Sequence, residues 1–323
     1  MRRRDVLIGL GSAALAGPTS TRAQSWPTKP IKIVAPFAAG GAADTLGRTI
    51  AEPLSNVLHQ QFYVENRGGA GGLIGAQTVA AAAPDGTTFV VSGIASHVIA
   101  PAISPNPGFD ALRDFTHIAY LGGPPVVLIV HPSLPVNSYS DLITHAKGLP
   151  AALAYTSPGT GTHGFLFAQN LARRENIKLT HIPYKGAGPA MMDLVGGHVM
   201  VGSITFSSAA QQIRKGTVKA LAVSSEKRLP NFPEIPTFKE LGYDDLVSET
   251  WFAFSGPANL PTEMVSLLHR EIATILQAPE VKKRMALDEI EVKVMTSTEL
   301  TQYIAAEIAR WAPLAKSLNL TIE

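Results

Sequence analysis

Glycine and hydroxyl residues gather in one short stretch of the sequence, SPGTGTHG at 157–164. The stretch follows an apolar run at 151–155 that predicts a strand, and a helical pattern comes after it. Gly159, Gly161 and Gly164 have the spacing G-x-G-x-x-G, which in a strand-to-helix turn can bind the pyrophosphate of a dinucleotide. The same turn can instead hold a smaller anion, because the first N–H groups of a helix have no partner within it.

A dinucleotide site also needs an acidic residue at the end of the next strand, where it binds the ribose hydroxyls. The next predicted strand ends in HIPYKG at 181–186, which contains no carboxylate. The sequence therefore favours a cradle for a single carboxylate. In this cradle the hydroxyls of Ser157, Thr160 and Thr162 and the N–H groups of the helix donate, and Gly161 lets the backbone approach the ligand closely.

A second glycine-containing loop, PFAAGGAAD at 36–44, follows the predicted strand 31–35. Gly40 and Gly41 allow backbone N–H groups to turn inward at the start of a helix, which makes an anion site. The alternative is a tight turn in which Asp44 serves as a capping charge at the helix N-terminus. We expect the loop to bind an anion.

Three further loops carry polar groups at the start of a predicted helix. The loop at 184–189 contains a lysine that is either a counter-ion for an anionic ligand or a solvated side chain. The loops at 92–97 and 205–208 present hydroxyls, and each alone is compatible with ordinary helix capping. The candidate residues from these loops are Tyr184, Lys185, Ser92, Ser96 and Thr205.

Signatures of enzymes and metal sites are missing from the sequence. Ser224-Ser-Glu-Lys227 matches S-x-x-K but has no companion S-D-N or K-T-G. There is no G-x-S-x-G, no H-E-x-x-H and no cysteine, and the nine histidines lack metal-ligand spacing. We therefore predict no catalytic residue, no metal and no cofactor.

The elements that must position these loops alternate along the chain. Strands are predicted at 31–35, 62–65, 87–92, 117–121, 126–130, 151–155, 179–183, 199–205, 218–223 and 250–255. Helices are predicted at 43–60, 74–83, 139–147, 163–174, 189–195, 207–215, 261–277, 280–287 and 297–317. This alternation predicts an α/β protein with mostly parallel sheets and helices on both faces.

The length of the chain and two breaks in its pattern predict two lobes. The breaks are LGGPP at 121–125 and a segment near 247–251. If the chain crosses at both, one lobe holds 24–124 plus 249–323 and the other holds 125–248. Two crossings make a hinge, and the open sheets of the two lobes then face a central ligand cleft.

The first 23 residues predict a cleavable export signal. Three arginines precede a short apolar run at 6–16, and Thr21-Arg22-Ala23 suits cleavage after Ala23. The signal suits the twin-arginine route and the general secretion route equally. Its removal leaves 23 basic and 24 acidic residues, a net charge of −1. This charge gives no reason to expect nucleic acid as a partner, and we expect a periplasmic protein.

Five motifs in fixed order resemble the Bug family, the periplasmic solute receptors of tripartite tricarboxylate transporters. They are WPTKPIKIVAPFAAGGAAD at 26–44, VENRGGAGGLIGA at 64–76, SPGTGTHG at 157–164, HIPYKGAGPAMMDLVGGHV at 181–199 and LPNFPEIPTFKELGY at 229–243. The resemblance covers nearly the whole mature chain. It implies a two-lobed type II periplasmic-binding-protein fold that closes on a small carboxylate.

The resemblance also implies a site. In this family the loop after the first strand and the Ser/Thr-Gly loop of the second lobe grip one carboxylate, which assigns Phe37 and Ala38 on one side and Ser157 with 160–162 on the other. Asp44 matches the acidic position after the paired glycines. Ala38-Ala39 stands where proline often follows the aromatic residue, which loosens the loop but keeps its amides.

Two functions remain open from the sequence. The leading hypothesis is a receptor, expected to be a monomer, that delivers a small carboxylate to the membrane components of a tripartite tricarboxylate transporter. The alternatives are an exported α/β enzyme acting on a small organic acid and a ligand-sensing receptor with a sensor histidine kinase as partner. An enzyme would show turnover and an acid/base pair in the cleft.

Overall fold

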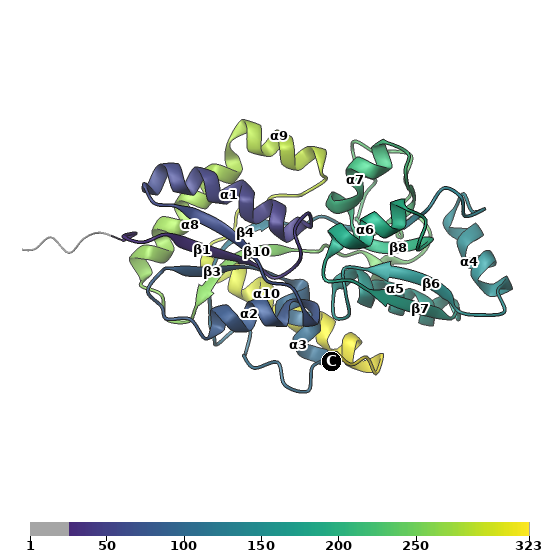
Figure 1. Ribbon diagram of the computed structural model, residues 1–323, viewed down its shortest axis with the longest axis horizontal. Coiled ribbons are helices and arrows are strands. Elements are labelled where there is room, and N and C mark those ends of the chain that lie inside the picture. The colour runs from purple at the N-terminus through teal and green to yellow at the C-terminus, as the bar shows by residue number, and fades with distance from the viewer. Residues whose placement is uncertain (1–25, 323) are drawn as a thin grey trace, which may run out of the picture.

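The computed structural model describes residues 26–322, which form two α/β lobes side by side (Figure 1). The predicted export signal, 1–23, lies outside the described residues. Each lobe is built on a five-stranded sheet covered by helices. The predicted α/β two-lobed architecture is therefore confirmed.

The first lobe contains the sheet β2-β1-β3-β10-β4. Its strands are β1 (Ile31–Ala35), β2 (Phe62–Asn66), β3 (Thr88–Gly93), β4 (Phe115–Gly122) and β10 (Phe252–Pro257). β1 pairs in parallel with β2 and β3, so that Ile33 stands beside Val64 and Phe89. β10 lies between β3 and β4 and is antiparallel to both.

The second lobe contains the sheet β7-β6-β8-β5-β9. Its strands are β5 (Val126–Val130), β6 (Leu153–Ser157), β7 (Leu179–Pro183), β8 (Val201–Thr205) and β9 (Lys219–Val223). β6 pairs in parallel with β7 and β8, whereas β5 is antiparallel to β8 and β9. All five side chains of β5 are buried, as expected for a strand covered on both faces.

The expectation of mostly parallel sheets is wrong, because half of the strand pairings in each sheet are antiparallel. The exceptions are β5 and β10, the two strands that begin directly after the chain has crossed from the other lobe. The parallel strands end at the edge of their sheet that faces the other lobe. A strand that enters from that edge must run the opposite way.

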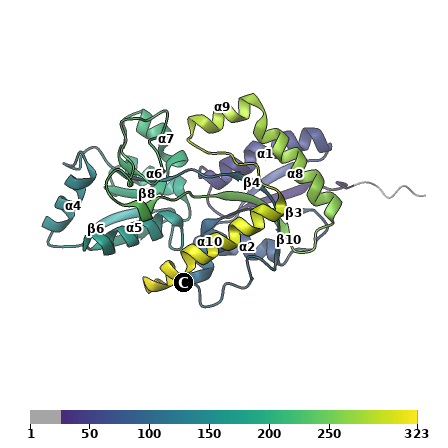
Figure 2. The same ribbon diagram turned by 180° about the vertical axis from the view of Figure 1, so that it is seen from behind.

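Helices cover both faces of both sheets (Figures 1 and 2). The helices of the first lobe are α1 (Ala42–Leu58), α2 (Leu73–Ala80), α3 (Ala100–Ile103), α8 (Thr262–Gln277), α9 (Pro279–Leu287) and α10 (Ser297–Ser317). Those of the second lobe are α4 (Tyr139–Gly148), α5 (His163–Glu175), α6 (Ala187–Val195) and α7 (Phe206–Arg214). Short helical turns lie at η1 (Ala70–Gly72), η2 (Ala95–Ile99) and η3 (Asp244–Leu246).

The side chains of β5 show how the buried faces are divided. Val127 and Ile129 pack in one apolar cluster with residues of α6 and α7. Leu128 and Val130 point to the opposite face, because successive side chains of a strand alternate, and they pack with residues of α4 and α5. The second cluster continues into the first lobe as far as Trp311 of α10, so the two lobes share one apolar core.

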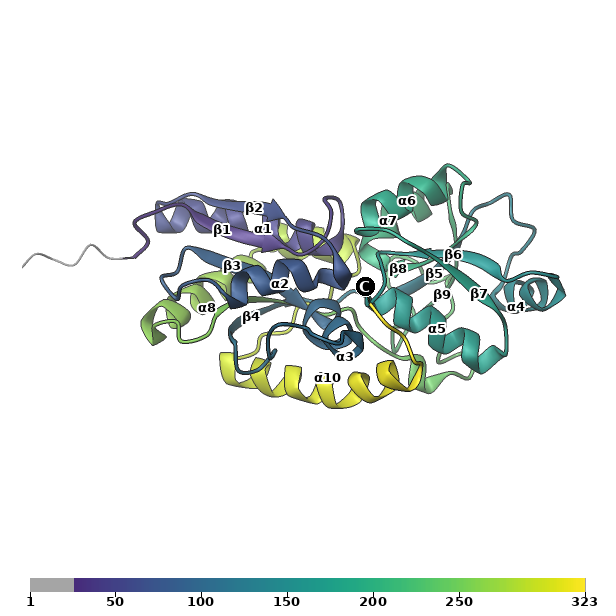
Figure 3. The same ribbon diagram turned by 60° about the horizontal axis from the view of Figure 1, so that its bottom comes forward.

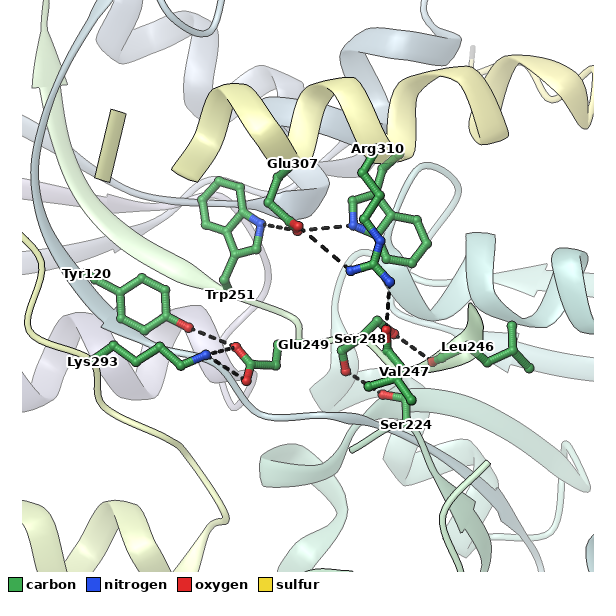
Figure 4. Close-up of polar contacts among 11 residues, drawn as sticks. Tyr120, Ser224, Leu246, Val247, Ser248, Glu249, Trp251, Lys293, Glu307 and Arg310 are labelled. Carbon is green, nitrogen blue, oxygen red and sulfur yellow. Dashed lines mark hydrogen bonds and ion pairs between the residues drawn. The ribbon is translucent and has the colours of Figure 1, made fainter. Parts of the chain in front are cut away.

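The chain passes between the lobes in two short segments, 123–125 after β4 and 247–251 before β10. Alternate residues of 247–251, the return segment, are held by the first lobe (Figure 4). The bonds run from Arg310 Nη2 to the Val247 carbonyl (2.7 Å), from Lys293 Nζ to the Glu249 carboxylate (2.7 and 2.8 Å) and from Trp251 Nε1 to Glu307 Oε2 (3.0 Å). Side chains of α10 and of the segment before it therefore hold the return segment by hydrogen bonds.

The intervening residues of the return segment, Ser248 and Thr250, bond to residues near β9 and in the other crossing segment. Ser248 donates its N–H to the carbonyl of Ser224 at 2.9 Å, and its own carbonyl accepts from the Ser224 hydroxyl at 2.7 Å. Thr250 donates its N–H to the carbonyl of Pro124, in the other crossing segment, at 2.8 Å. The return segment is thus bonded to the first lobe, to Ser224 directly after β9 in the second lobe, and to the other crossing segment. The predicted limits of the lobes as moving bodies stay a prediction.

Candidate functional site

The loops that follow the parallel strands of the two lobes face one another and enclose two adjoining cavities. The outer cavity has a volume of about 310 Å³ and the inner one about 40 Å³. Phe37, after β1, and Pro158, after β6, line both cavities. They mark the passage between the cavities, and a ligand could occupy both.

The starts of four helices surround the inner cavity. Its lining includes Gly41, Ala42 and Ala43 at the start of α1, Thr162, His163 and Gly164 at the start of α5, Ala187 at the start of α6, and Thr205 before α7. The remaining lining residues are Phe37, Ala95, Pro158, Thr250 and Phe252. The first N–H groups of each helix lack partners within the helix and carry a partial positive charge.

No lining residue of the inner cavity is an acid, a lysine or an arginine. His163 is uncharged at neutral pH, because burial, with a smaller contribution from Arg310, lowers its pKa to about 3. The electrostatic character of the cavity is therefore set by the helix N-termini and by hydroxyl groups. Such a surface favours an anion that accepts hydrogen bonds.

The outer cavity carries a basic side chain and a phenol. It is lined by Gly69 with η1 on the first lobe and by 158–160, Tyr184 and Lys185 on the second. Burial, with the Asp193 carboxylate that accepts from the phenol, raises the pKa of Tyr184 to about 12. Tyr184 is thus a neutral hydrogen-bonding group beside the lysine.

The end of the chain also lines the outer cavity. After α10 the chain turns back toward the junction of the lobes (Figure 3). Thr321 and Ile322 line the cavity, and the N–H of Ile322 donates to the carbonyl of Ile103 at 3.4 Å. Ile322 is buried and belongs to the shared core.

The two lobes touch directly around these cavities. The N–H of Ala38, in the first lobe, donates to the carbonyl of Lys185, in the second, at 2.8 Å. A Cβ added at Gly188 would lie 2.5 Å from the carbonyl oxygen of Ala39, and one added at Gly71 would lie 2.7 Å from that of Thr160. The backbones meet without intervening side chains, so glycines permit this closeness.

Seven of the residues predicted from the sequence line the cavities. They are Phe37, Thr160, Tyr184 and Lys185 at the outer cavity, and Phe37, Gly41, Thr162 and Thr205 at the inner one. Thr162 caps α5 and donates its hydroxyl to the Gly159 carbonyl at 2.7 Å. The structure brings these residues together from both lobes, and their contact with a ligand stays a prediction.

Other predicted residues lie behind the cavity walls. Ser157 is fully buried, and its hydroxyl bonds to Nε2 of His181 at 2.7 Å and to the backbone of Gly159. Gly161 packs against Ala100 and Ile322, with a left-handed φ of +82°. Both residues shape the loop 157–164 from behind.

Asp44 also fixes a loop. Its carboxylate accepts from the N–H of Gly40 at 3.1 Å, from Nε of Arg48 at 3.0 Å and from Nδ2 of Asn66 at 3.0 Å. Asn66 donates in turn to the carbonyl of Phe37 at 3.0 Å. Burial raises the pKa of Asp44, but the hydrogen bonds outweigh burial and leave the pKa below its ordinary value.

We predict that Asp44→Asn lowers the free energy of unfolding at pH 7 by about 1–3 kcal/mol, because hydrogen bonds to an ionised group are lost. The lowered pKa means that this stabilisation is present above the unfolded-state pKa and is lost as the pH falls through the folded-state pKa. Urea unfolding at pH 7 and pH 3 measures it, with exposed Glu52→Gln of the same helix as the control. An equal loss at both pH values would contradict this role of the charge.

Ser92 and Ser96 do not line either cavity. The hydroxyl of Ser92 lies inside the first sheet, 2.7 Å from the Ser255 hydroxyl and 3.1 Å from the Ala253 carbonyl. The hydroxyl of Ser96 is buried 2.9 Å from Nδ1 of His97. Of the loop 92–97, the residue that reaches the inner cavity is Ala95.

Some cavity residues were not predicted as site residues. The glycine pair at 71–72 stood in a quoted motif, and its Gly-Gly repeat was a visible signal of close backbone approach. His163 stood in the quoted motif 157–164 without being singled out, and nothing in the sequence around Thr250 marks it as a site residue. Ile322 is brought to the cavity only by the return of the chain after α10.

Two searches of residues 26–322 bear on other classes of site. No three His, Asp or Glu side chains in this part of the chain gather as a metal ion would require. None of its helices combines the length and the apolar character needed to cross a membrane.

Comparison with known proteins identifies relatives over the whole chain. The family model described as "Tripartite tricarboxylate transporter family receptor" matches residues 46–320. The chain is 33% identical to Protein BugT of Bordetella pertussis, with 100% of this chain and 99% of that protein covered. It is 35% identical to a UPF0065 protein of Pseudomonas sp. strain P51, with 98% and 95% covered.

Solved structures agree with these matches. The periplasmic binding protein BugD has a TM-score of 0.87 at 32% identity, with 92% of this chain and 99% of that chain covered. A protein of R. palustris with adipate has a TM-score of 0.88 at 31% identity, with the same coverage. MatC from Rhodopseudomonas palustris, with bound malate, has a TM-score of 0.86 at 29% identity, with 90% and 100% covered.

These matches confirm the resemblance to the Bug receptors and the periplasmic-binding-protein fold. They identify a periplasmic transport family whose members are receptors and not enzymes, so the alternative of an exported enzyme falls away. The chain belongs to the family of solute receptors of tripartite tricarboxylate transporters.

Proposed function

We propose that this receptor binds a small organic carboxylate between its lobes, with one carboxylate group in the inner cavity. The observation that carries the proposal is the convergence of four helix N-termini on a cavity whose lining has no acid and no permanent charge. Aligned N–H groups attract an anion without a paired cation. At 10–15 Å³ for each water-sized position, about 40 Å³ is room for a carboxylate group.

The outer cavity would receive the rest of the ligand. Phe37 and Pro158, at the passage, offer apolar contact to a short carbon chain. Lys185 lies beyond, where its ammonium group can bind a second carboxylate or another oxygen acceptor. The Tyr184 hydroxyl beside it donates its hydrogen to Asp193 and can only accept from a ligand. This arrangement suits dicarboxylates of modest length as well as shorter acids. The relatives with adipate and with malate are consistent with this class of ligand.

The remaining parts of the proposal concern location and partners. Residues 1–23 would direct export and be removed, which leaves a periplasmic receptor. The receptor would close on its carboxylate and deliver it to the membrane components of a tripartite tricarboxylate transporter. Family membership supports this partner over a sensor kinase.

A thermal-shift screen of the mature protein tests the proposal. The panel is acetate, pyruvate, succinate, malate, adipate and citrate. NAD is added to test the alternative that the loop 157–164 binds a dinucleotide. At a hundred times its Kd, a bound acid stabilises the folded state by about 2.7 kcal/mol, so the melting temperature should rise by several degrees. Calorimetry then gives the affinity of each acid that produces a shift.

The matched control is the methyl ester of the best-bound acid, or the dimethyl ester of a diacid. An ester cannot accept the full set of N–H and hydroxyl donors as a carboxylate does, so its affinity should fall by about tenfold or more. Equal binding of acid and ester, or a shift with NAD alone, would overturn the proposed carboxylate site.

A further inference from the structure

We propose that Thr250, in the return segment, donates its hydroxyl hydrogen to the carboxylate in the inner cavity, and that His163 positions this hydroxyl. The inference rests on the proposed function and adds a ligand contact that the sequence motifs do not mark. Both residues line the inner cavity and both are buried, His163 to 99% and Thr250 to 95%. Their polar atoms Nδ1 and Oγ1 are 2.9 Å apart.

The backbone N–H of Thr250 and the side chain of the next residue are both held by hydrogen bonds. Its N–H donates to the carbonyl of Pro124 at 2.8 Å, and the next residue, Trp251, donates its indole N–H to Glu307 at 3.0 Å. Figure 4 shows the bonds that fix the neighbouring residues of the segment. The Thr250 side chain is therefore carried by a rigid support.

The direction of the bond between Thr250 and His163 follows from the other ring nitrogen. Nε2 of His163 is buried and has no hydrogen-bond partner among the described residues. The imidazole ring as a whole packs against aromatic rings, with centroid distances of 6.5 Å to Phe167 and 5.3 Å to Trp311. An uncharged imidazole has one N–H, and a buried N–H without an acceptor is rarer in proteins than an unused lone pair. The hydrogen therefore belongs on Nδ1, where it is donated to Thr250.

A second histidine and hydroxyl pair, in the sheet of the first lobe, has the opposite direction. Nδ1 of His117 lies 2.9 Å from the Ser255 hydroxyl, but Nε2 of His117 lies 2.9 Å from the carbonyl of Ala111. A carbonyl accepts only, so the hydrogen of His117 is on Nε2 and Ser255 must donate to Nδ1. Ser255 thus has no hydrogen left for another acceptor, whereas Thr250 keeps its own.

The Thr250 hydroxyl accordingly offers one donor to the inner cavity. The partner that it selects is an acceptor, such as a carboxylate oxygen, and not an ammonium group. Since Thr250 belongs to the segment that joins the lobes, the bond would also tie the ligand to the hinge. The inner cavity would then recognise the carboxylate from both lobes and from the segment between them.

The test compares Thr250→Val, which removes the hydroxyl and keeps the shape, with Thr250→Ser, which keeps it. The probe is the acid of the panel above that wild-type protein binds best. A hydrogen bond to a charged group corresponds to about a 10- to 100-fold loss of affinity in calorimetry for the valine variant. The serine variant should stay within about threefold of wild type, a difference of about 0.7 kcal/mol. Ser255→Ala, in β10 and outside the cavities, is the control and should bind as wild type does.

His163 is tested through the same hydroxyl. Asparagine can place an amide N–H near the position of Nδ1, so His163→Asn should retain most of the affinity that His163→Leu loses. In the Thr250→Val background His163→Leu should cause little further loss, because the two residues act on one bond. Additive losses would show a merely structural role for His163 and overturn its positioning.

The outcomes separate this inference from the proposed function. If wild-type protein binds no acid of the panel, the proposed function fails and the inference fails with it. If wild type binds and Thr250→Val binds equally well, only the inference fails. Should the valine variant not fold, the comparison of Thr250→Ala with Thr250→Ser gives the same decision.

Discussion

Replacing Gly188 with alanine is expected to weaken carboxylate binding by about 10- to 100-fold without lowering the stability of the ligand-free receptor. Gly188 lies in the first turn of α6, and an added Cβ would lie 2.5 Å from the carbonyl oxygen of Ala39 in the other lobe. Backbone atoms cannot move aside as a flexible side chain can. The clash exists only when the lobes touch, so it penalises closure.

The stability of the separate lobes should not suffer, because alanine is a better helix former than glycine by about 1 kcal/mol. Calorimetry with the best-bound acid measures the affinity, and solution scattering measures closure. Wild type should become more compact with ligand, whereas the Gly188→Ala variant should not. Gly196→Ala is the control, since the nearest atom to its Cβ is the carbonyl oxygen of Met192 in its own helix, at 3.3 Å. Tight binding by Gly188→Ala would mean that the ligand does not require this contact between the lobes.

The sequence allowed the strands to be predicted well, because apolar runs separated by turn residues mark buried strands. Each predicted strand overlaps one in the structure, and the predicted strand 126–130 coincides with β5. The direction of each strand was harder to predict from the sequence. The antiparallel course of β5 and β10 follows from the crossings between lobes, and local composition does not record it. No helix range was predicted over 95–103, where the structure has η2 and α3, although the loop at 92–97 was expected to open a helix. The apolar residues of this segment continue those of β3, which obscured it.

The candidate site divides in the same way. Loops that follow a strand and open a helix were identified from glycine and hydroxyl residues, and 36–41 and 157–162 do face each other across the cavities. The orientation of single side chains could not be predicted from the sequence. The hydroxyls of Ser92 and Ser157 turn into the protein, whereas Thr250, with no motif around it, lines the inner cavity. Tertiary packing decides which way such a side chain points.

The G-x-G-x-x-G spacing in the loop 157–164 has a physical basis that needs no dinucleotide. In a nucleotide-binding turn the third glycine permits close packing of the helix on a strand. Gly164 has that role here, because a Cβ at this position would overlap the carbonyl oxygen of Ser203 in β8. The Ser203 hydroxyl donates to the carbonyl of Gly164 at 2.8 Å, which holds α5 against the strand.

Gly164→Ala is therefore expected to destabilise the protein by at least about 3 kcal/mol, the upper range for overpacking, because the obstacle is backbone in the centre of a sheet. The helix and β8 would have to separate, which would also displace Thr162 and Thr205 at the inner cavity. Urea unfolding measures the loss, with Gly148→Ala at the end of α4 as the control.

A Cβ at Gly148 meets no atom within 4 Å, so that variant should be as stable as wild type or slightly more stable. The two substitutions remove the same backbone freedom from the unfolded chain, and their difference isolates the contact of α5 with β8. If Gly164→Ala were as stable as Gly148→Ala, helix packing could not explain the spacing of the three glycines. The explanation left to test would then be close contact between the loop and the ligand. A large difference would instead mean that helix packing alone requires the third glycine, while Gly159 and Gly161 shape the loop at the cavities.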